Sequence, residues 1–336
     1  MPDPRLDVLC IGNAIVDVIA DATDEFLAAQ GLTKDSMRLV DADEAKRLYD
    51  HMQPAREVSG GCAGNTAAGI AALGGRAGFI GQVAPDQLGE FYRHDLTAAR
   101  VEFTTPPADI GVPTARSMIL VTPDGHRTMN TFLGAAQELS VEVLDEEQIR
   151  DSAILYLEGY LWDPETPRYA MVRAIEIARD AGRKVAFSLS DLFCVERHRD
   201  GFTGLIDGGR IDILFANEAE ILAMGGVPHL DTAVAAIAPK VETLVVTRGA
   251  AGALAVRGGE RVDVPAEPVR EVVDTTGAGD LYAAGVLFGL TRGLPLPTCG
   301  TIGSLCAAEI ISHMGARPES RLDQIVAPAL SDTRHL

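Results

Sequence analysis

The residues best suited to chemistry lie at 274–280, where the sequence Asp-Thr-Thr-Gly-Ala-Gly-Asp sets a run of small residues between two aspartates. A β-rich run, residues 270–273, precedes this segment, and a helical pattern over residues 280–292 follows it. We therefore expect a strand-to-helix turn, where free backbone N–H groups and the helix dipole form an anion site. An aspartate beside a bound anion suits phosphoryl transfer, because its carboxylate can take a proton from the attacking hydroxyl.

Asp280 is the predicted general base of such a reaction, and the backbone N–H groups of Gly277, Ala278 and Gly279 are the predicted anion hole. A helix N-terminus favours the ionised form of a carboxyl group, so we expect a low pKa for Asp280 and a weak base. A weak base suffices where positioning does most of the work. The simpler interpretation is a capped turn whose acidic residue is worth about 0.3–1 kcal/mol to the helix. The complete seven-residue pattern favours catalysis.

A second glycine-rich segment supports the catalytic interpretation. Residues 59–67 read Ser-Gly-Gly-Cys-Ala-Gly-Asn-Thr-Ala and are followed by Leu-Gly-Gly at 73–75 and by Gly81. The two segments, about 215 residues apart, resemble the N-terminal and C-terminal signatures of the ribokinase-like family of sugar and nucleoside kinases. The resemblance covers nearly the whole chain. Within that family, residues 12–17 and 121–131 look most like bacterial adenosine kinase-like members.

Composition excludes several classes of protein. With 336 residues, 47% of them hydrophobic, the chain can form one large α/β domain or two smaller ones, and it is neither disordered nor fibrous. No apolar run reaches the roughly 18–20 residues that span a bilayer, and the N-terminus lacks the pattern of a secretory signal. Five cysteines, an odd number without a Cys-x-x-Cys pair, fit a reducing compartment. We therefore expect a cytoplasmic protein.

The formal net charge of −19 argues against nucleic acid or an anionic membrane as a partner, because both require a positive field. The expected partners are small molecules. The chain lacks the P-loop sequence, the Gly-x-Gly-x-x-Gly turn of dinucleotide-binding folds, and the residue clusters of zinc or acyl-transfer enzymes. A polyanionic nucleotide must then be bound by backbone N–H groups, a divalent cation and a few arginines.

Apolar strand patterns alternate with helical patterns along most of the chain. The strands are expected at residues 7–11, 77–80, 153–157, 184–188, 211–215 and 243–247, and helices at 66–73, 88–99, 167–181, 218–224 and 232–238. Buried strands separated by helices indicate a mostly parallel sheet covered on both faces. We expect a three-layer α/β/α fold in a single domain, residues 1–336, because no linker or repeat divides the chain.

Two regions break this alternation. Residues 14–20 and 37–40 look like short strands with no full crossover helix between them, and residues 115–122 and 126–131 form a hairpin pattern around Pro-Asp-Gly. We expect a small β lid formed by segments about 14–40 and 104–132; the alternative is an edge extension of the main sheet. The resemblance implies a lid that closes over the sugar or nucleoside and, in some members, joins two subunits. Both a monomer and a lid-mediated homodimer remain open.

The acceptor site is expected in the N-terminal half, where Gly-Asn-Ala-Ile-Val-Asp at 12–17 ends the first strand. The resemblance implies that Asn13 and Asp17 bind sugar hydroxyls. Gly60, Gly61 and Asn65 are expected to complete this pocket, the glycines letting the sugar approach the backbone. Two arginines of the lid hairpin, Arg116 and Arg127, could close over the substrate or neutralise phosphate charge, although a plain surface arginine is the simpler interpretation of each.

Two further motifs are assigned to the nucleotide. The resemblance implies that Asn217 and Glu220, in Asn-Glu-Ala-Glu, organise Mg²⁺ and the phosphates of ATP, with Glu220 acting through water. Taken alone, the same residues would be a helix capping box. Thr247, Gly249 and Gly252 match a Thr-x-Gly-x-x-Gly nucleotide loop, for which an ordinary β-turn is the alternative.

The resemblance also implies that Asp274 and Thr276 help to hold a monovalent cation such as K⁺, together with backbone carbonyls of residues 312–317. Capping of the following turn by Asp274 is an equally good interpretation. His313 lies where relatives line the adenine pocket, but a lone histidine is more often structural, and we leave it out of the predicted site.

Together these observations predict an ATP-dependent phosphotransferase acting on a primary hydroxyl of a nucleoside, with adenosine to AMP as the favoured reaction. A kinase for ribose, fructose or a related sugar is the alternative, because sugar kinases of the family share every catalytic motif. A non-catalytic ligand-binding protein is the third hypothesis, although it predicts an eroded base or anion hole. A base-stacking aromatic near the acceptor would favour a nucleoside, and the candidates are Phe132, Tyr160, Trp162 and Phe193.

Overall fold

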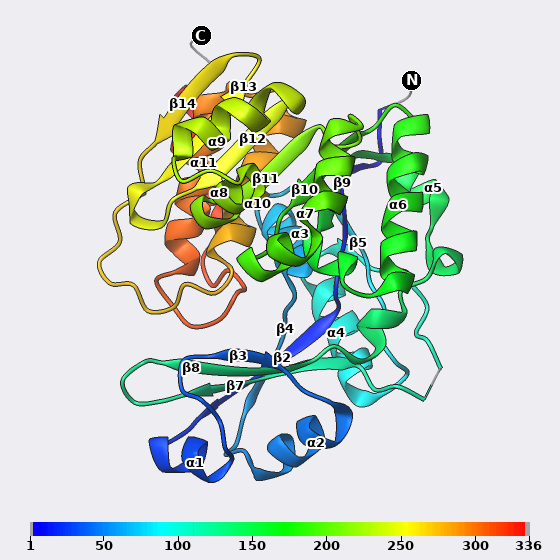
Figure 1. The fold of residues 1–336 in the computed structure, drawn as a ribbon, viewed down its shortest axis with the longest axis vertical. Coiled ribbons are helices and arrows are strands. Elements are labelled where there is room, and N and C mark those ends of the chain that lie inside the picture. The colour runs from blue at the N-terminus through cyan, green and yellow to red at the C-terminus, as the bar shows by residue number, and fades with distance from the viewer. Residues whose placement is uncertain (1–2, 110, 333–336) are drawn as a thin grey trace.

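The computed structural model describes residues 3–109 and 111–332, and Figure 1 shows a large layered body above a small sheet. A nine-stranded sheet in the order β14-β13-β12-β11-β10-β9-β1-β5-β6 forms the centre of the body. Its strands are β1 (Leu6–Ile11), β5 (Ala77–Ile80), β6 (Val101–Glu102), β9 (Ser152–Glu158), β10 (Lys184–Ser188), β11 (Ile213–Asn217), β12 (Thr243–Thr247), β13 (Ala253–Arg257) and β14 (Glu260–Val264). All neighbours from β6 to β12 are parallel, and β13 and β14 add antiparallel strands at one edge.

Helices cover both faces of this sheet. One face packs against α3 (Cys62–Ala72), α4 (Gln87–Ala98), α10 (Ala278–Thr291) and α11 (Leu296–Ile310); the other packs against α5 (Glu146–Arg150), α6 (Glu165–Asp180), α7 (Leu192–Asp207), α8 (Glu218–Gly225) and α9 (Leu230–Ile237). Strand β1 shows why: Leu9 and Ile11 enter one core, while Val8 and Cys10 enter the other, and all four are fully buried. The predicted three-layer α/β/α fold is confirmed.

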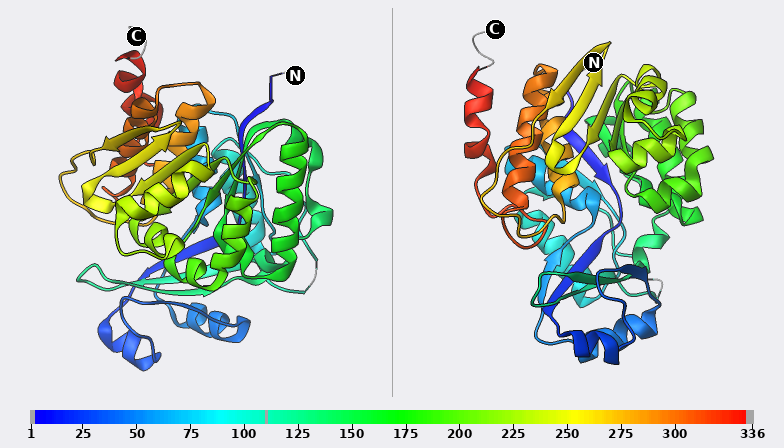
Figure 2. Two further views of the ribbon diagram at one scale, coloured as in Figure 1. Left: turned by 45° about the horizontal axis from the view of Figure 1, so that its top comes forward. Right: turned by 60° about the vertical axis from the view of Figure 1, so that its left-hand side comes forward.

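The small sheet has the order β3-β8-β7-β2-β4 and is formed by β2 (Ile15–Asp21), β3 (Met37–Leu39), β4 (Arg56–Ser59), β7 (Ala115–Val121) and β8 (Arg127–Phe132). Strands β7 and β8 pair antiparallel, as the hairpin pattern predicts. Helices α1 (Asp24–Ala29) and α2 (Ala42–His51), on the side that faces away from the body in Figure 2, bury a separate core that includes Leu48 and Leu120. Strand β4 and both helices were not predicted from the sequence.

The β-rich run before the glycines does not form a strand. Residues 271–275 have no regular secondary structure, Val272 and Val273 are exposed, and Val273 N–H donates to the carbonyl of Ile311 at 2.8 Å. The expected strand is therefore wrong, because the backbone of this run bonds to the residue after α11 instead of to an edge of the sheet. The helix after it is present as α10, which packs so closely on α11 that a Cβ on Gly285 would lie 2.7 Å from the Cα of Gly303.

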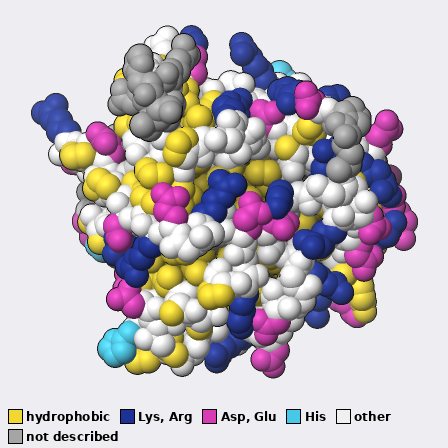
Figure 3. Space-filling model, turned by 90° about the horizontal axis from the view of Figure 1, so that it is seen from above, with side chains coloured by type: hydrophobic (Ala, Val, Ile, Leu, Met, Phe, Trp, Pro, Cys, Tyr) yellow, Lys and Arg dark blue, Asp and Glu magenta, His cyan; other side chains and the backbone are white. Residues whose placement is uncertain are grey.

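The C-terminal part continues with α12 (Leu322–Ile325) and α13 (Ala327–Asp332), which pack near α11. Among the described residues, no single helix is long and apolar enough to cross a membrane; one pair bent by 66°, Glu218–Gly225 with Leu230–Lys240, meets the criteria of length and composition together. Figure 3 shows the face of the body opposite the small sheet, where acidic and basic side chains are interspersed instead of gathered by sign.

Candidate active site

A cavity of about 360 Å³ lies where the carboxyl ends of the central strands meet the small sheet. Asn13 follows β1, Glu158 ends β9 and Asp191 follows β10, and all three line the cavity. Ligands of open α/β sheets bind at this end of the strands. The cavity brings together residues predicted from separate motifs, namely Asn13, Asp17, Gly61, Asn65, Thr276, Gly277 and Asp280.

The turn at the start of α10 has the form that an anion site requires. Gly277 is the N-cap with φ +79°, and a Cβ on it would lie 2.8 Å from that of Ala316, so both conformation and space demand glycine. In the described part of the chain, the N–H groups of Gly277 and Gly279 have no hydrogen-bond partner, whereas Ala278 N–H donates to Thr275 at 3.2 Å. Two free donors and the end of the helix dipole therefore point toward any anion bound there.

Asp280 lies in the first turn of α10, and its carboxylate accepts a hydrogen bond of 2.8 Å from Asn65 Nδ2. Burial raises the pKa of Asp280 to about 6, against the opposing effects of Asn65, the nearby Cys62 thiol and the Arg317 charge. The expectation of a low pKa is therefore wrong, because removal of water outweighs the helix N-terminus. The higher pKa makes this carboxylate a better base at neutral pH.

Glu158 is a central residue of the cavity that was not among the residues predicted from the sequence. Its Oε1 accepts bonds of 2.8 Å from both the backbone N–H and the Nδ2 of Asn13, and its Oε2 accepts a bond of 2.9 Å from Ala63 N–H. Burial raises its pKa to about 7. Glu158 thus fixes the Asn13 amide and the start of α3. An acidic residue directly after an apolar strand of the parallel sheet was the available signal.

Asp17, on β2 of the small sheet, faces the same cavity. None of the described residues makes a hydrogen bond to its carboxylate. Burial raises the pKa of Asp17 to about 7, with Asp280 and Asp274 adding to this effect and Arg317 and Arg127 opposing it. A Cβ on Gly60 would lie 2.3 Å from Asp17 Oδ2, so only glycine fits there. An unpartnered carboxylate in a cavity is free to accept hydroxyl groups of a ligand.

Arg127 of β8 reaches from the small sheet to the loop before α10. Its Nη2 lies 2.5 Å from Asp274 Oδ2 and its Nη1 donates to Thr276 Oγ1 at 2.6 Å. The interpretation of Arg127 as a surface arginine is wrong, because its side chain is only 14% exposed. Arg116 of β7 instead lies over the ring of Tyr49, at 5.5 Å from its centroid.

The contacts of Asp274 show whether its carboxylate is free to bind a monovalent cation. Asp274 Oδ1 accepts from Thr276 N–H at 2.9 Å, which is the predicted capping interaction, and Oδ2 accepts from Gly315 N–H at 2.8 Å as well as pairing with Arg127. The guanidinium already supplies the positive charge at this carboxylate. The residues as arranged therefore do not fit K⁺ at Asp274 unless Arg127 moves away.

The two nucleotide motifs meet at the carboxyl ends of β11 and β12, where Asn217 pairs in register with Thr247. Asn217 and Glu220 form a capping box at the start of α8, and both Glu220 oxygens accept bonds from Asn217. Burial raises the pKa of Glu220 to about 7. Gly249 lies in the short helix η5 (Gly249–Ala251), and Gly252 has φ +82°. These residues lie outside the cavity around Asp280.

The donor set near Glu220 fits Mg²⁺ bound largely by water and phosphate. With both of its oxygens engaged by Asn217, Glu220 can contact the ion through water without breaking the capping box. Within residues 3–109 and 111–332, no group of three or more His, Cys, Asp or Glu side chains is placed to hold a metal ion. An all-protein metal cage is therefore absent from this part of the chain.

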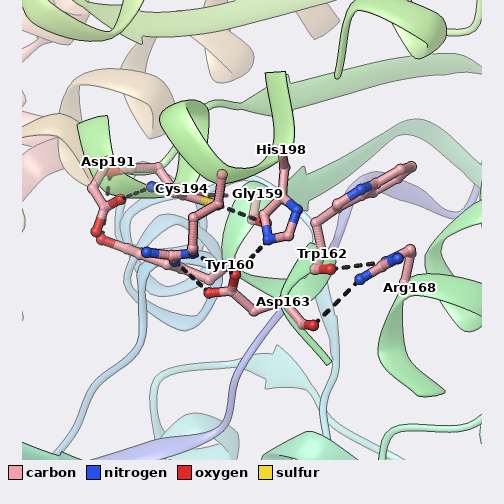
Figure 4. Close-up of polar contacts among 10 residues, drawn as sticks. Gly159, Tyr160, Trp162, Asp163, Arg168, Asp191, Cys194 and His198 are labelled. Carbon is pink, nitrogen blue, oxygen red and sulfur yellow. Dashed lines mark hydrogen bonds and ion pairs between the residues drawn. The ribbon is translucent and has the colours of Figure 1, made fainter. Parts of the chain in front are cut away.

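Further polar residues follow β9 and β10. Figure 4 shows Asp163 beside His198, whose Nε2 lies 2.5 Å from Asp163 Oδ1, while Arg168 donates to the carbonyl of Trp162 at 2.8 Å. Arg197 also pairs with Asp163, at 2.6 Å, and this pair lines the cavity. Ser190, nearby in the chain, has φ +73°, a strained conformation of the kind found at functional sites.

Of the four aromatic candidates, Tyr160 and Phe193 line the cavity. Trp162 packs against Phe202, with ring centroids 5.8 Å apart, and Phe132 packs against the core beneath α1 and α2. Which of these aromatics reaches the cavity depends on contacts between segments that are distant in the sequence.

Comparisons with known proteins identify the family. Residues 6–322 match the model of the pfkB family carbohydrate kinases. A structure of adenosine kinase from Sinorhizobium meliloti is 49% identical, with 97% of this chain and 99% of that chain covered and a TM-score of 0.90. A probable sugar kinase from Rhizobium etli CFN 42 is 46% identical, covers 97% and 99% of the two chains and has a TM-score of 0.91. Adenosine kinase of Saccharomyces cerevisiae is 29% identical over 92% of this chain and 95% of its own length.

These matches extend over nearly all of the described residues, and they include both the large body and the small sheet. The family match begins at the start of β1 and ends at α12. The chain therefore belongs to the pfkB family of carbohydrate kinases and is an ATP-dependent kinase with the ribokinase-like fold.

Proposed function

We propose that the protein transfers the γ-phosphoryl group of ATP to the primary hydroxyl of a nucleoside, and that its reaction is adenosine to AMP. The observation that carries this proposal is the apolar rim of the cavity. Phe193 is 64% exposed, and Leu39 and Met37 of β3 are 59% and 50% exposed, yet all three line the cavity. Large apolar side chains exposed at a cavity favour a flat apolar ligand surface such as a nucleobase.

The polar part of the cavity suits the ribose. Asn13, held by Glu158, presents a fixed amide, and the unpartnered Asp17 can accept two neighbouring hydroxyl groups. A Cβ on Gly60 would meet Asp17 and one on Gly61 would meet the Asn13 carbonyl, so the sugar is expected to approach the backbone there, and Asn65 contacts Asp280 at the end where the phosphoryl group is transferred. A polar floor beneath an apolar rim matches a molecule with a sugar at one end and a base at the other.

Phosphoryl transfer is assigned to the start of α10. The ionised Asp280 accepts the proton of the attacking hydroxyl, and the free N–H groups of Gly277 and Gly279 receive the charge that develops on the transferring group. A bound Mg²⁺ neutralises charge on the ATP phosphates. Asn217 and Glu220 would hold it through water, with the loop containing Thr247, Gly249 and Gly252 beside the nucleotide.

The small sheet is proposed to act as a lid on a single domain, residues 1–336. Its expected segments, about 14–40 and 104–132, bring Met37, Leu39 and Arg127 to the cavity side, and β4 joins them. Closure excludes water, which competes with the acceptor for the phosphoryl group. Potassium is left out of this proposal because Arg127 occupies the Asp274 carboxylate.

A sugar kinase is the second candidate. The Rhizobium etli relative is described as a probable sugar kinase, and Asn13 and Asp17 could bind the hydroxyls of a free sugar equally well. The exposed Phe193, Met37 and Leu39 would then have no ligand surface to cover. This apolar rim is the reason to favour the nucleoside.

The test is ATP consumption, with Mg²⁺, against adenosine, inosine, guanosine, ribose, fructose and 2-keto-3-deoxygluconate. Turnover on adenosine alone is the expected result, and Asp280→Asn should reduce it by about 10²–10⁴-fold. Turnover on a free sugar would overturn the acceptor assignment but leave the base in place. Tight binding of adenosine without turnover by the unaltered protein would overturn the enzymatic proposal and favour a ligand-binding role.

A further inference from the structure

Arg317, in the loop after α11, contacts the residue that contacts the proposed base. Its Nη1 donates to Asn65 Oδ1 at 2.8 Å, and Asn65 Nδ2 donates to Asp280 Oδ2 at 2.8 Å. The Asn65 amide therefore spans the distance between a guanidinium and a carboxylate. Asn65 itself is 4% exposed and lies in the first turns of α3.

The orientation of this amide matters because its two ends are chemically different. Only the NH₂ end can donate to the Asp280 carboxylate, and an amide turned by 180° would place its oxygen against that carboxylate. A guanidinium has donors and no acceptor, so Arg317 tolerates only the oxygen end. The contact with Arg317 consequently excludes the orientation that would repel Asp280.

Arg317 is itself fixed by the small sheet and by α4. Its Nε and Nη2 donate to Ser59 Oγ at 3.2 and 2.8 Å, and the Ser59 hydroxyl donates to the Asp95 carboxylate. Ser59 is fully buried at the end of β4, and Asp95 belongs to α4. A planar fork that contacts two partners at once is a geometry that lysine cannot reproduce.

We propose that Arg317 is a positioning residue of the phosphoryl-transfer reaction: anchored through Ser59 to Asp95, it locks the Asn65 amide in the orientation that donates to Asp280. The inference rests on the proposed role of Asp280 as base. Asn65, in the N-terminal glycine-rich segment, then orients the Asp280 carboxylate in addition to making the substrate contact expected of it.

Charge adds a second effect to this geometry. The positive charge of Arg317 lowers the pKa of Asp280 and of Asp17, in opposition to burial, which raises both. The titratable groups around Asp280 are Cys62 of α3, Asp17 of β2, Tyr156 and Glu158 of β9, and Arg317. Because Arg317 is the cation among them, its loss should raise the pKa of Asp280.

The experiment compares Arg317→Met with Arg321→Met. Arg321 lies four residues further along, pairs with Asp323 at 2.6 Å, and is largely exposed, so it is a matched control. Arg317→Met should reduce kcat about 100-fold, since misplacement of a catalytic group has effects of that order, and should move the acidic limb of the kcat–pH profile to higher pH. Arg321→Met should match the unaltered protein in both respects.

Two milder variants keep the inference testable if Arg317→Met does not fold. Arg317→Lys retains the charge but not the fork, and should lower kcat while leaving the acidic limb near its original pH. Ser59→Ala removes the anchor and should reduce kcat by a smaller factor, again with an unshifted limb. Unchanged kcat in both, or an Arg317→Met profile identical to that of Arg321→Met, would overturn the inference.

A readout independent of turnover separates this inference from the proposed function. The Asp280 carboxyl pKa can be followed by NMR in protein labelled with ¹³C at aspartate carboxyl carbons, with Asp280→Asn assigning the signal. We expect a higher pKa in Arg317→Met than in Arg321→Met, whichever acceptor is used. If the unaltered protein phosphorylates none of the acceptors, the proposed function fails, while an equal Asp280 pKa in the two variants overturns the role of Arg317.

Discussion

The Arg127 guanidinium lies 2.5 Å from the Asp274 carboxylate and thereby joins the small sheet to the loop that carries Gly277. The two side chains are 14% and 1% exposed, so water screens their attraction only weakly. Arg127 also donates to Thr276 Oγ1 at 2.6 Å. Loss of one partner of a buried pair leaves the other charge unpaired, which is strongly unfavourable. The ion pair between Arg127 and Asp274 therefore couples the position of the proposed lid to the shape of the anion site.

Arg127→Met should break this coupling. With the loop less ordered, kcat/KM should fall by about tenfold to 100-fold, because the anion site is no longer held in position. Steady-state kinetics checks this result, and Lys34→Met is the matched control. Lys34 is a cation of the same region that pairs with Asp24 and Asp124, away from Asp274. Equal losses in the two variants would show that the Arg127 contact has no special role.

The same ion pair predicts little dependence on potassium. Because Arg127 already places a positive charge at Asp274, replacing K⁺ by choline at constant ionic strength should change kcat by less than about twofold. Arg127→Met removes that charge and should make kcat sensitive to K⁺. A large K⁺ activation of the unaltered protein, with Arg127 present, would contradict this assignment of the cation at Asp274.

The pKa of Asp280 should set the acidic limb of the kcat–pH profile. A base must be ionised, and burial raises the pKa of Asp280 to about 6, so kcat should fall about tenfold per pH unit below that value. Asp280→Asn should lose about 10²–10⁴-fold in kcat across the whole range. Asp323→Asn removes a partly exposed acid that pairs with Arg321, and this control should retain the profile. A limb that persists in residual Asp280→Asn turnover would assign the base elsewhere.

The raised pKa of Asp17 should make acceptor binding depend on pH. Its pKa is raised to about 7 by burial, so the fraction of ionised carboxylate increases between pH 6 and pH 8. Hydroxyl groups bind a carboxylate more strongly than a neutral acid, and the acceptor KM should therefore fall as the pH rises. Asp17→Asn should raise KM about 10- to 100-fold and remove this trend. An acceptor KM that is flat with pH in the unaltered protein would argue against Asp17 as the hydroxyl ligand.

Most of the large body could be predicted from the sequence because its signals are local. Strand β1 is apolar at every position except Asp7, and the glycines at 274–280 indicate the start of α10 to within a few residues. The β-rich run 270–273 was misleading, since its valines are exposed and only tertiary contacts decide whether such a run joins a sheet. The small sheet was only partly recognised, because β4 and α2 carry short, mixed patterns.

The pKa values and long-range contacts of the site were harder to predict, because they depend on which side chains the fold buries together. The pKa of Asp280 depends on water excluded by distant segments, and not on the helix N-terminus that the sequence reveals. Arg127 looks like a surface arginine until the fold brings it to Asp274, 147 positions along the chain. Glu158 could have been found from its place after a parallel strand, whereas the contact of Arg317 with Asn65, 252 residues apart, could not.

Phe193 offers the sharpest distinction between a nucleoside and a sugar. Its ring is 64% exposed at the cavity and should gain a partner only when a base is bound. Phe193→Ala should therefore raise the adenosine KM by about tenfold or more, since stacking on an aromatic ring contributes about 1–3 kcal/mol. The KM for ATP should stay the same, because the nucleotide motifs around Asn217 and Thr247 lie outside this cavity.

Tyr169→Ala is the matched control for that variant. Tyr169 is also an exposed aromatic, at 62%, but it belongs to α6 and its hydroxyl contacts Glu165. Its removal should leave both KM values unchanged. If Phe193→Ala and Tyr169→Ala bind adenosine equally well, the apolar rim does not hold a base. If Phe193→Ala at the same time turns over ribose or fructose as the unaltered protein does, the acceptor is a sugar, and Asn13 and Asp17 alone account for its recognition.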